Sequence, residues 1–379
     1  MFKHALTIAR IRGIRIDIHA SWLVIAVILV LGMTTGFLQQ YPDWSVVTAA
    51  LTALAAALVF FSSIVAHELG HSLTAIRRGV PVRSITLFIF GGVAELERDS
   101  ERAEDEFWIA LAGPAVSLVL AGLFGLLSWV LSGLPEPVSV ALGWLALVNL
   151  VVALFNMIPG FPLDGGRVFR AIVWRLTGSA RKGVDAAVLG GRLVAYGLFA
   201  LALYNIVVVG NIGGGLWILL IAWFLLSMAQ NQGRQFSLKQ ALQGVTAADL
   251  AEADPPRVAS GTTLRDWVDH QVLPTARRAA LVTDGQQTLG IISFSDTGQV
   301  DTDAWAGTSV DQVMTGQDRW ISVTDDTPAD VVLQRMTAGQ LNQLPVLAQE
   351  RVVGWIERQH LLHAIELYTA VDARRTQNR

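Results

Sequence analysis

Six apolar segments long enough to cross a membrane constrain the fold of this 379-residue chain more than any other feature. In lipid the backbone N–H and C=O groups must be satisfied internally, which makes helices the expected structure for such segments. Composition agrees, because 53% of the residues are hydrophobic and 16% are charged, against roughly 25% charged residues in soluble domains. We therefore expect a polytopic α-helical membrane protein with spans near residues 20–37, 46–76, 106–131, 138–158, 189–209 and 216–228.

The distribution of basic residues predicts the orientation of these spans. Lys and Arg cluster before the first span, after the second and after the fourth, whereas the loops 38–45, 132–137 and 210–215 contain none. Basic loops stay on the cytoplasmic side of a membrane. We expect both termini in the cytoplasm and, in a bacterium-like cell, a plasma-membrane protein. The first span lacks a small-residue cleavage site, so we expect it to be a retained anchor.

The second apolar segment ends in the sequence His67-Glu68-Leu69-Gly70-His71. Two histidines four residues apart share one face of a helix and can bind one Zn²⁺, while Glu68 can accept a proton from water that the metal polarises. If Arg77 marks the cytoplasmic boundary, His71 and His67 lie about 9 and 15 Å inside it. Ionisable groups at this depth are costly and usually functional, which argues against two ordinary polar residues near a helix end. We expect an intramembrane metal site that water reaches from the cytoplasm.

A catalytic zinc site uses three protein ligands, so the two histidines leave one to be found. Asp164 is the candidate, because Pro159, Gly160 and Pro162 break the chain just before it. Broken backbone at membrane depth persists where it is packed in protein or lines a wet cavity. A carboxylate exposed by such a break can face the metal. The alternative is a solvated Asp164 in an ordinary cytoplasmic loop.

Composition also excludes several kinds of chemistry. The chain has no cysteine, which rules out disulfides, thiolate zinc ligands and cysteine nucleophiles. The formal net charge is −3 and no block of Lys and Arg occurs, so nothing favours binding to nucleic acid.

The segment 81–97 is too short for a helical span, is rich in β-forming residues and has Gly91-Gly92 at a possible turn. We expect a β-hairpin that dips into the membrane beside the metal site. Its unpaired edge could accept an unwound substrate segment as an added strand. The alternative is a structural hairpin that fills the helix bundle.

These motifs together resemble the site-2 protease family of intramembrane zinc metalloproteases. The resemblance covers residues 1 to about 230. It rests on the histidine motif at 67–71, on Ala112-Gly113-Pro114 in the third span, on the Asn156–Gly165 run, and on the opening stretch 13–22. From the residues alone, we expect Gly113 and Pro114 to kink the third span or to allow close packing.

The resemblance implies specific roles. His67, His71 and Asp164 would bind zinc, and Glu68 would be the general base for hydrolysis of a peptide bond within a transmembrane segment. Asn156 matches a family position expected to hold the substrate or its oxyanion; the alternative is a helix–helix hydrogen bond. The family analogy points to regulated intramembrane proteolysis of a single-span protein, such as an anti-sigma factor, or of a leftover signal peptide.

Beyond residue 228 the composition becomes polar and a repeat of about 60 residues follows, with 245–250 matching 309–314 and 279–293 matching 344–357. Two such units resemble a tandem pair of CBS domains, β-α-β-β-α modules that commonly bind adenine nucleotides and self-associate. We expect a protease domain at 1–230, a linker at 231–244, the CBS pair at 245–367 and a polar tail at 368–379.

Only the first repeat contains a sequence similar to the nucleotide-binding motif of these modules. Ser293 and Asp296 stand at the matching positions, whereas the second repeat has Glu357 and His360. We expect at most one adenine nucleotide site, and a homodimer formed through the CBS pair. The alternative is a docking or dimerisation module without a small ligand.

A transporter or channel gated by the CBS pair is the competing hypothesis, with His67, His71 and Asp164 as an ion site. It does not explain why Glu68 stands at the general-base position, and no repeat between membrane halves is apparent. A catalytically idle relative is a third hypothesis, which the intact ligands and base argue against. We expect a zinc-dependent metalloendopeptidase modulated by its CBS pair.

Overall fold

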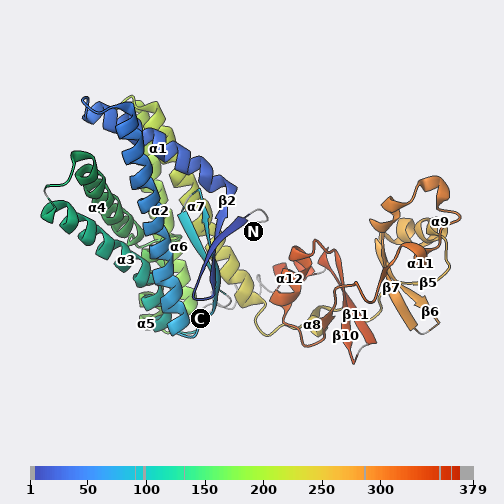
Figure 1. Cartoon of the computed structure of the whole chain (residues 1–379). Coiled ribbons are helices and arrows are strands. Elements are labelled where there is room, and N and C mark those ends of the chain that lie inside the picture. Colours follow the sequence, from blue (N-terminus) through green and yellow to red (C-terminus); the bar gives the residue numbers. More distant parts are fainter. Residues whose placement is uncertain are drawn as a thin grey trace. The chain divides into compact units, whose positions relative to one another are not determined.

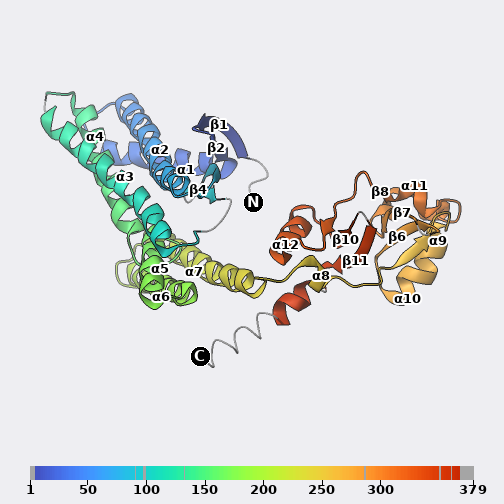
Figure 2. The ribbon, with the colours of Figure 1, turned by 90° about the horizontal axis from the view of Figure 1, so that it is seen from below.

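The computed structural model describes residues 5–89, 91–96, 100–131, 133–285, 287–349, 351–359 and 361–367. The predicted polar tail 368–379 lies outside the described residues. The chain forms two compact units, Met1–Arg234 and Gln235–Arg379, which are described separately (Figures 1 and 2).

The described residues contain six helices that are long and apolar enough to cross a membrane, as the sequence predicts. They are α1 (Ala20–Gln40), α2 (Val46–Arg77), α3 (Ala103–Val130), α4 (Glu136–Asn156), α6 (Ala180–Val207) and α7 (Ile212–Ala241). Local capping sets several of their ends. Ser45 Oγ accepts a hydrogen bond from Thr48 N at the start of α2, and three acidic residues occupy the first turn of α3. Helix α7 continues to Ala241, so most of the segment expected to be a linker is helical.

A four-stranded sheet lies on one side of α2, and α3 and α4 lie on the other (Figures 1 and 2). The strand order is β1 (Ala5–Ile11), β2 (Ile14–His19), β3 (Val82–Phe88) and β4 (Gly91–Leu96). Strands β2 and β3 are parallel, and the other two pairs are antiparallel.

The predicted hairpin is therefore β3–β4, but it is one half of a sheet rather than an isolated element. Strands β1 and β2 are not among the predicted elements, although Ile14, Ile16 and Ile18 alternate with polar residues at the period of a strand. Because β2 pairs with β3, the only unpaired edge of the hairpin within the described strands belongs to β4.

The segment after α4 also differs from the expectation. A turn at residues 157–163 leads into an additional amphipathic helix, α5 (Asp164–Thr177), of which Asp164 is the first residue. Because Gly165 and Gly166 are poor helix formers, the sequence pattern did not predict this helix. The structure requires glycine there, because a Cβ at Gly165 would collide with the backbone of Met157 and one at Gly166 with that of Gly160.

The second unit contains two similar modules. In each, a short strand pairs in parallel with the first strand of an antiparallel hairpin, and a helix precedes the hairpin. The first module comprises β5 (Arg257–Ala259), α9 (Leu264–Trp267), β6 (Ala279–Asp284) and β7 (Gln287–Ser293), with β8 (Thr315–Gly316) added to its sheet. The second comprises β9 (Val323–Thr324), α12 (Ala329–Ala338), β10 (Gln343–Ala348) and β11 (Arg351–Glu357). Shorter helices are α8 (Ala247–Leu250), α10 (Leu273–Thr275) and α11 (Val310–Val313).

Each module buries its own apolar core. Leu264, Val282 and Ile292 are buried together in the first module, and Val332, Val346 and Ile356 in the second. This strand pairing confirms the internal repeat predicted from the sequence.

Candidate metal centre

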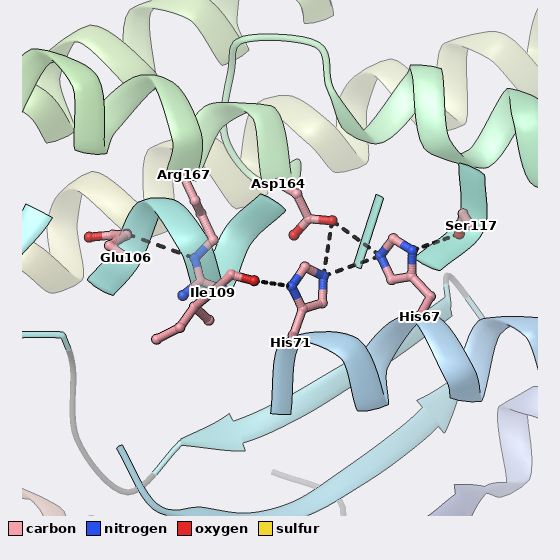
Figure 3. A network of polar contacts seen from close by, with 7 residues as sticks. All are labelled: His67, His71, Glu106, Ile109, Ser117, Asp164 and Arg167. Atoms are coloured by element: carbon pink, nitrogen blue, oxygen red, sulfur yellow. Dashed lines mark hydrogen bonds and ion pairs between the residues drawn. The ribbon is translucent and has the colours of Figure 1, made fainter. Parts of the chain in front are cut away.

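The two histidines of the second span lie one turn apart on the buried side of α2. His67 is 4% and His71 is 5% exposed. The Nε2 atoms of both rings lie 3.2 Å from Oδ2 of Asp164 and 3.2 Å from each other (Figure 3). Three donor atoms from α2 and α5 thus form a nearly equilateral triangle, although Asp164 is 97 residues from His67.

The triangle fits the donor set and geometry of a zinc site. Zinc in proteins prefers tetrahedral coordination by imidazole nitrogen and carboxylate oxygen at about 2.0–2.1 Å, which places neighbouring donors about 3.3 Å apart. The observed separations of 3.2 Å therefore match one face of such a tetrahedron. Within the described part of the chain, no other group of three or more His, Asp or Glu side chains is placed to hold a metal ion.

Helix α3 orients both imidazole rings through their other nitrogen atoms. Nδ1 of His71 donates to the backbone carbonyl of Ile109 at 2.7 Å, and Nδ1 of His67 is 2.9 Å from Ser117 Oγ (Figure 3). Partners of this kind hold the ring and the tautomer so that Nε2 presents its lone pair to a metal.

Gly113 lies between these two partners and faces the same rings. A Cβ at this position would be 2.7 Å from Nε2 of His67 and would also collide with Nε2 of His71. Glycine thus leaves open the space in front of the two donor atoms. The sequence interpretation assigned Gly113 only to kinking or close packing, and the structure adds this second reason.

Glu68 lies against the edge strand of the sheet. A Cβ added to Gly92 in β4 would be 2.9 Å from Cδ and 3.0 Å from Oε1 of Glu68. Glu68 therefore packs on the face of β4 at Gly92, in the strand that forms the unpaired edge of the hairpin.

Asn156 is the last residue of α4, and the turn at 157–163 joins it to Asp164. Its side chain is half-buried and forms no hydrogen bond with any of the described residues. The helix–helix hydrogen bond considered as an alternative is therefore not seen in this part of the chain, and the substrate role stays a prediction.

Helix α6 holds the turn that precedes Asp164. The backbone N–H of Phe161 donates to the carbonyl of Ala187 at 3.0 Å. A Cβ at Gly190 would collide with the carbonyl of Pro159, and one at Gly191 with that of Phe161. Backbone therefore packs directly on backbone here, which fixes the turn against α6.

The candidate nucleotide residues of the first module lie together after β7. Asp296 Oδ2 accepts hydrogen bonds from Ser293 N at 2.8 Å and from Ser293 Oγ at 3.0 Å. In the second module, Glu357 ends β11, and His360 lies outside the described residues.

Sequence reasoning missed the partners that α3 and β4 supply to the site. Ile109, Gly113 and Ser117 are spaced four residues apart, so they share one face of α3, and this spacing was the available signal. No local signal connects Gly92 with Glu68, because their contact depends on how the sheet packs on α2.

Two family models and several proteins of known name match this chain. The family model for peptidase family M50 matches residues 55–141 and 134–198, and that for the CBS domain matches residues 310–367. The protein sll0528 of Synechocystis sp. is 34% identical over 368 residues, which cover 94% of each chain. Rip3 of Mycobacterium tuberculosis is 34% identical over 372 residues, which cover 97% of this chain and 94% of Rip3.

Both relatives carry the name zinc metalloprotease. The solved structure of a site-2 protease from Methanocaldococcus jannaschii is 26% identical and covers 61% of this chain and 95% of its own, with a TM-score of 0.42. The match to the peptidase family and the two relatives do not favour the transporter hypothesis. The chain belongs to peptidase family M50, the site-2 proteases, and is a multi-pass intramembrane zinc metalloendopeptidase with a C-terminal CBS domain pair.

Proposed function

We propose that His67, His71 and Asp164 hold the catalytic zinc, and that Glu68 is the general base in hydrolysis of a peptide bond within a transmembrane segment. The observation that carries this proposal is the triangle of donor atoms with 3.2 Å sides, buried inside a membrane-length helix bundle. Zinc bound there would supply Lewis-acid activation of water and of the scissile carbonyl.

Side chains of the protein carry out the proton transfers and stabilise the developing charge. The carboxylate of Glu68 takes a proton from the attacking water and returns it to the nitrogen of the leaving amine. The amide of Asn156 donates a hydrogen bond to the substrate carbonyl as negative charge develops on its oxygen. Ser117 and the carbonyl of Ile109 keep the two imidazoles oriented throughout.

The β4 edge supplies the step that a helical substrate requires. A peptide bond in a helix is shielded by its own hydrogen bonds, so the substrate must unwind before attack. Strand β4 can replace the lost hydrogen bonds by accepting the substrate as a further strand. Contact between Gly92 and Glu68 supports this role, because a strand added at that edge runs beside the general base. The substrate class is a single-span membrane protein, for example an anti-sigma factor, or a leftover signal peptide.

Replacing a proposed ligand tests the metal assignment. We expect His67→Ala and Asp164→Ala to weaken zinc binding by roughly 100-fold or more, because loss of an outer partner alone costs about 10–100-fold. Zinc content of the purified proteins and chelator competition measure the effect. Asp185→Ala is the matched control, since Asp185 on α6 is 65% exposed and pairs with Arg181. Full zinc occupancy in Asp164→Ala would place the third ligand elsewhere.

The chain is proposed to lie in the plasma membrane with both termini in the cytoplasm. Absence of Lys and Arg from the loops 38–45, 132–137 and 210–215 supports this orientation. We expect tags inserted after Tyr41 and after Pro135 to react with a membrane-impermeant reagent in intact cells. A tag at the C-terminus should react only after the membrane is permeabilised. An external C-terminus would contradict the orientation.

The CBS pair is proposed to modulate the protease and to form the contact of a homodimer. We assign the protease domain to residues 1–230, the linker to 231–244, the CBS pair to 245–367 and the tail to 368–379. The separation of the chain into two compact units near residue 234 supports this division. A nucleotide can change activity only if it binds two arrangements of the enzyme with different affinities.

Asp296→Ala tests the nucleotide site. We expect AMP or ATP to change cleavage by the full-length enzyme by about 5-fold or more, which is the low end of typical coupling between sites. Asp296→Ala should lower the affinity for the nucleotide at least about 5-fold, because its carboxylate is the proposed acceptor of a hydrogen bond from the ribose. Asp318→Ala, a change of an 80% exposed residue in the same unit, is the control. An unchanged response in Asp296→Ala would exclude the first module as the site.

A further inference from the structure

A buried carboxylate on α3 connects that helix to the helix that carries Asp164. Glu106 is 2% exposed and stands in the first turn of α3. Its Oε1 atom lies 3.2 Å from Nη1 of Arg170 and 3.8 Å from Nε of Arg167. Both arginines belong to α5, and Figure 3 shows Arg167 reaching Glu106 from the helix that begins at Asp164.

Glu106 lies in line with the groups that orient the histidines. Glu106, Ile109, Gly113 and Ser117 are spaced three, four and four residues apart, so they share one face of α3. Ile109 holds His71, Ser117 holds His67, and Gly113 leaves the space in front of both rings. Glu106 is the member of this row that reaches α5. One face of one helix therefore contacts every element that carries a proposed ligand.

The contact with α6 holds the turn before Asp164, and the contact with Glu106 holds the helix that follows it. The next two residues, Gly165 and Gly166, have no side chains, and the preceding residues form a turn. Arg167 and Arg170 follow Asp164 by three and six residues, so their contacts with Glu106 set both the rotation and the axial position of the first two turns of α5. Ion pairs in a buried setting hold one geometry when the charges remain paired.

We propose that Glu106 is a positioning residue for Asp164. Acting through Arg167 and Arg170, it holds α5 in the rotation that keeps Oδ2 of Asp164 beside the two imidazoles. This inference rests on the proposed role of Asp164 as a zinc ligand.

The test uses the full-length enzyme with Glu106→Gln, which removes the charge and keeps the shape. We expect zinc affinity, measured by chelator competition, to fall about 10–100-fold, as for loss of other groups that orient a ligand. The visible spectrum of the Co²⁺-substituted protein should change, because that spectrum reports the coordination geometry. The kcat should fall while KM stays within about 2-fold, and Glu106→Asp should restore part of the affinity.

Asp105→Asn is the matched control. Asp105 is the neighbouring acid on α3 and pairs with Arg78 at 3.0 Å, whereas Glu106 pairs with the arginines of α5. We expect its zinc affinity, cobalt spectrum and kcat to match the wild type. Loss of zinc affinity in both variants would show a general effect of charge at this helix end and would overturn the proposal.

A second variant separates positioning from loss of folding. Glu106→Gln removes the buried negative charge that pairs with Arg170, whereas Glu106→Gln/Arg170→Met removes both charges. We expect the double variant to recover thermal stability but to keep the weakened zinc binding. Wild-type zinc affinity in either variant would overturn the proposal. Asp164→Ala in the same assay distinguishes the failures: if it keeps zinc, the ligand assignment fails, and if it alone loses zinc, only the role of Glu106 fails.

Discussion

Glu68→Gln is expected to lower kcat by roughly 10³-fold while zinc remains bound. General acid–base catalysis by one positioned side chain contributes typically 10²–10⁴-fold, and the amide of glutamine cannot accept the proton from water. Zinc should stay, because the proposed ligands are His67, His71 and Asp164, whose donor atoms form the triangle without Glu68. The variant thus separates the base from the metal ligands.

Cleavage kinetics and metal analysis of the same preparation measure this result. Glu136→Gln is the matched control: Glu136 is an acid in the first turn of α4 whose Oε2 accepts a hydrogen bond from Trp44 Nε1 at 2.9 Å, and the change should leave kcat within about 2-fold. If Glu68→Gln loses zinc as completely as His67→Ala, then Glu68 contributes to metal binding. If it keeps wild-type activity, the base is another group. An inactive variant that keeps zinc would also retain substrates in native membranes, where they can be identified.

Gly113→Ala is expected to weaken zinc binding by roughly 100-fold or more, an effect as large as loss of a ligand. The added methyl group would occupy the space immediately in front of Nε2 of both His67 and His71. The rings cannot simply turn away, because Ser117 and the carbonyl of Ile109 hold their Nδ1 atoms from the same face of α3. Helix α3 is also packed against α2, α4 and α5, which opposes its displacement.

Gly122→Ala on the same helix is the matched control for this substitution. A Cβ at Gly122 meets nothing within 4 Å, and alanine is about 1 kcal/mol better than glycine in a helix, so the variant should be neutral or slightly more stable. Zinc affinity and melting temperature of both variants decide the matter. A Gly113→Ala protein that binds zinc like the wild type would show that α3 can move and that the space is not required.

Much of the fold follows from patterns local in the sequence. Hydropathy located the six spans, because a lipid environment selects long apolar helices. Helical periodicity predicted that His67 and His71 share a face, since residues four apart lie one turn above each other, and their Nε2 atoms lie 3.2 Å apart. The internal repeat predicted two similar modules, and their strand pairing is the same in both. The residue roles at the metal centre stay predictions until they are tested.

Other features depend on contacts between distant segments. The hairpin became half of a four-stranded sheet because β2, at Ile14–His19, pairs with β3, which begins more than 60 residues later. Helix α5 forms although Gly165 and Gly166 are poor helix formers. Neighbouring backbone leaves no room for a Cβ at either position, and the arginines of the helix pair with Glu106. Propensity alone predicts a loop there, and tertiary packing overrides it.

The sequence by itself determined the membrane class, the number of spans, the histidine pair with its intervening glutamate, and the repeat in the second unit, because each is written in the spacing of neighbouring residues. Only the tertiary structure decided what surrounds that pair. Asp164 meets the histidines across 93 and 97 residues of chain, Ser117 and Ile109 orient them from α3, and Gly92 brings the sheet edge to Glu68. Those contacts are set by how helices and the sheet pack on one another, and helix packing is specified by the complementary shape of whole faces, which no local period encodes.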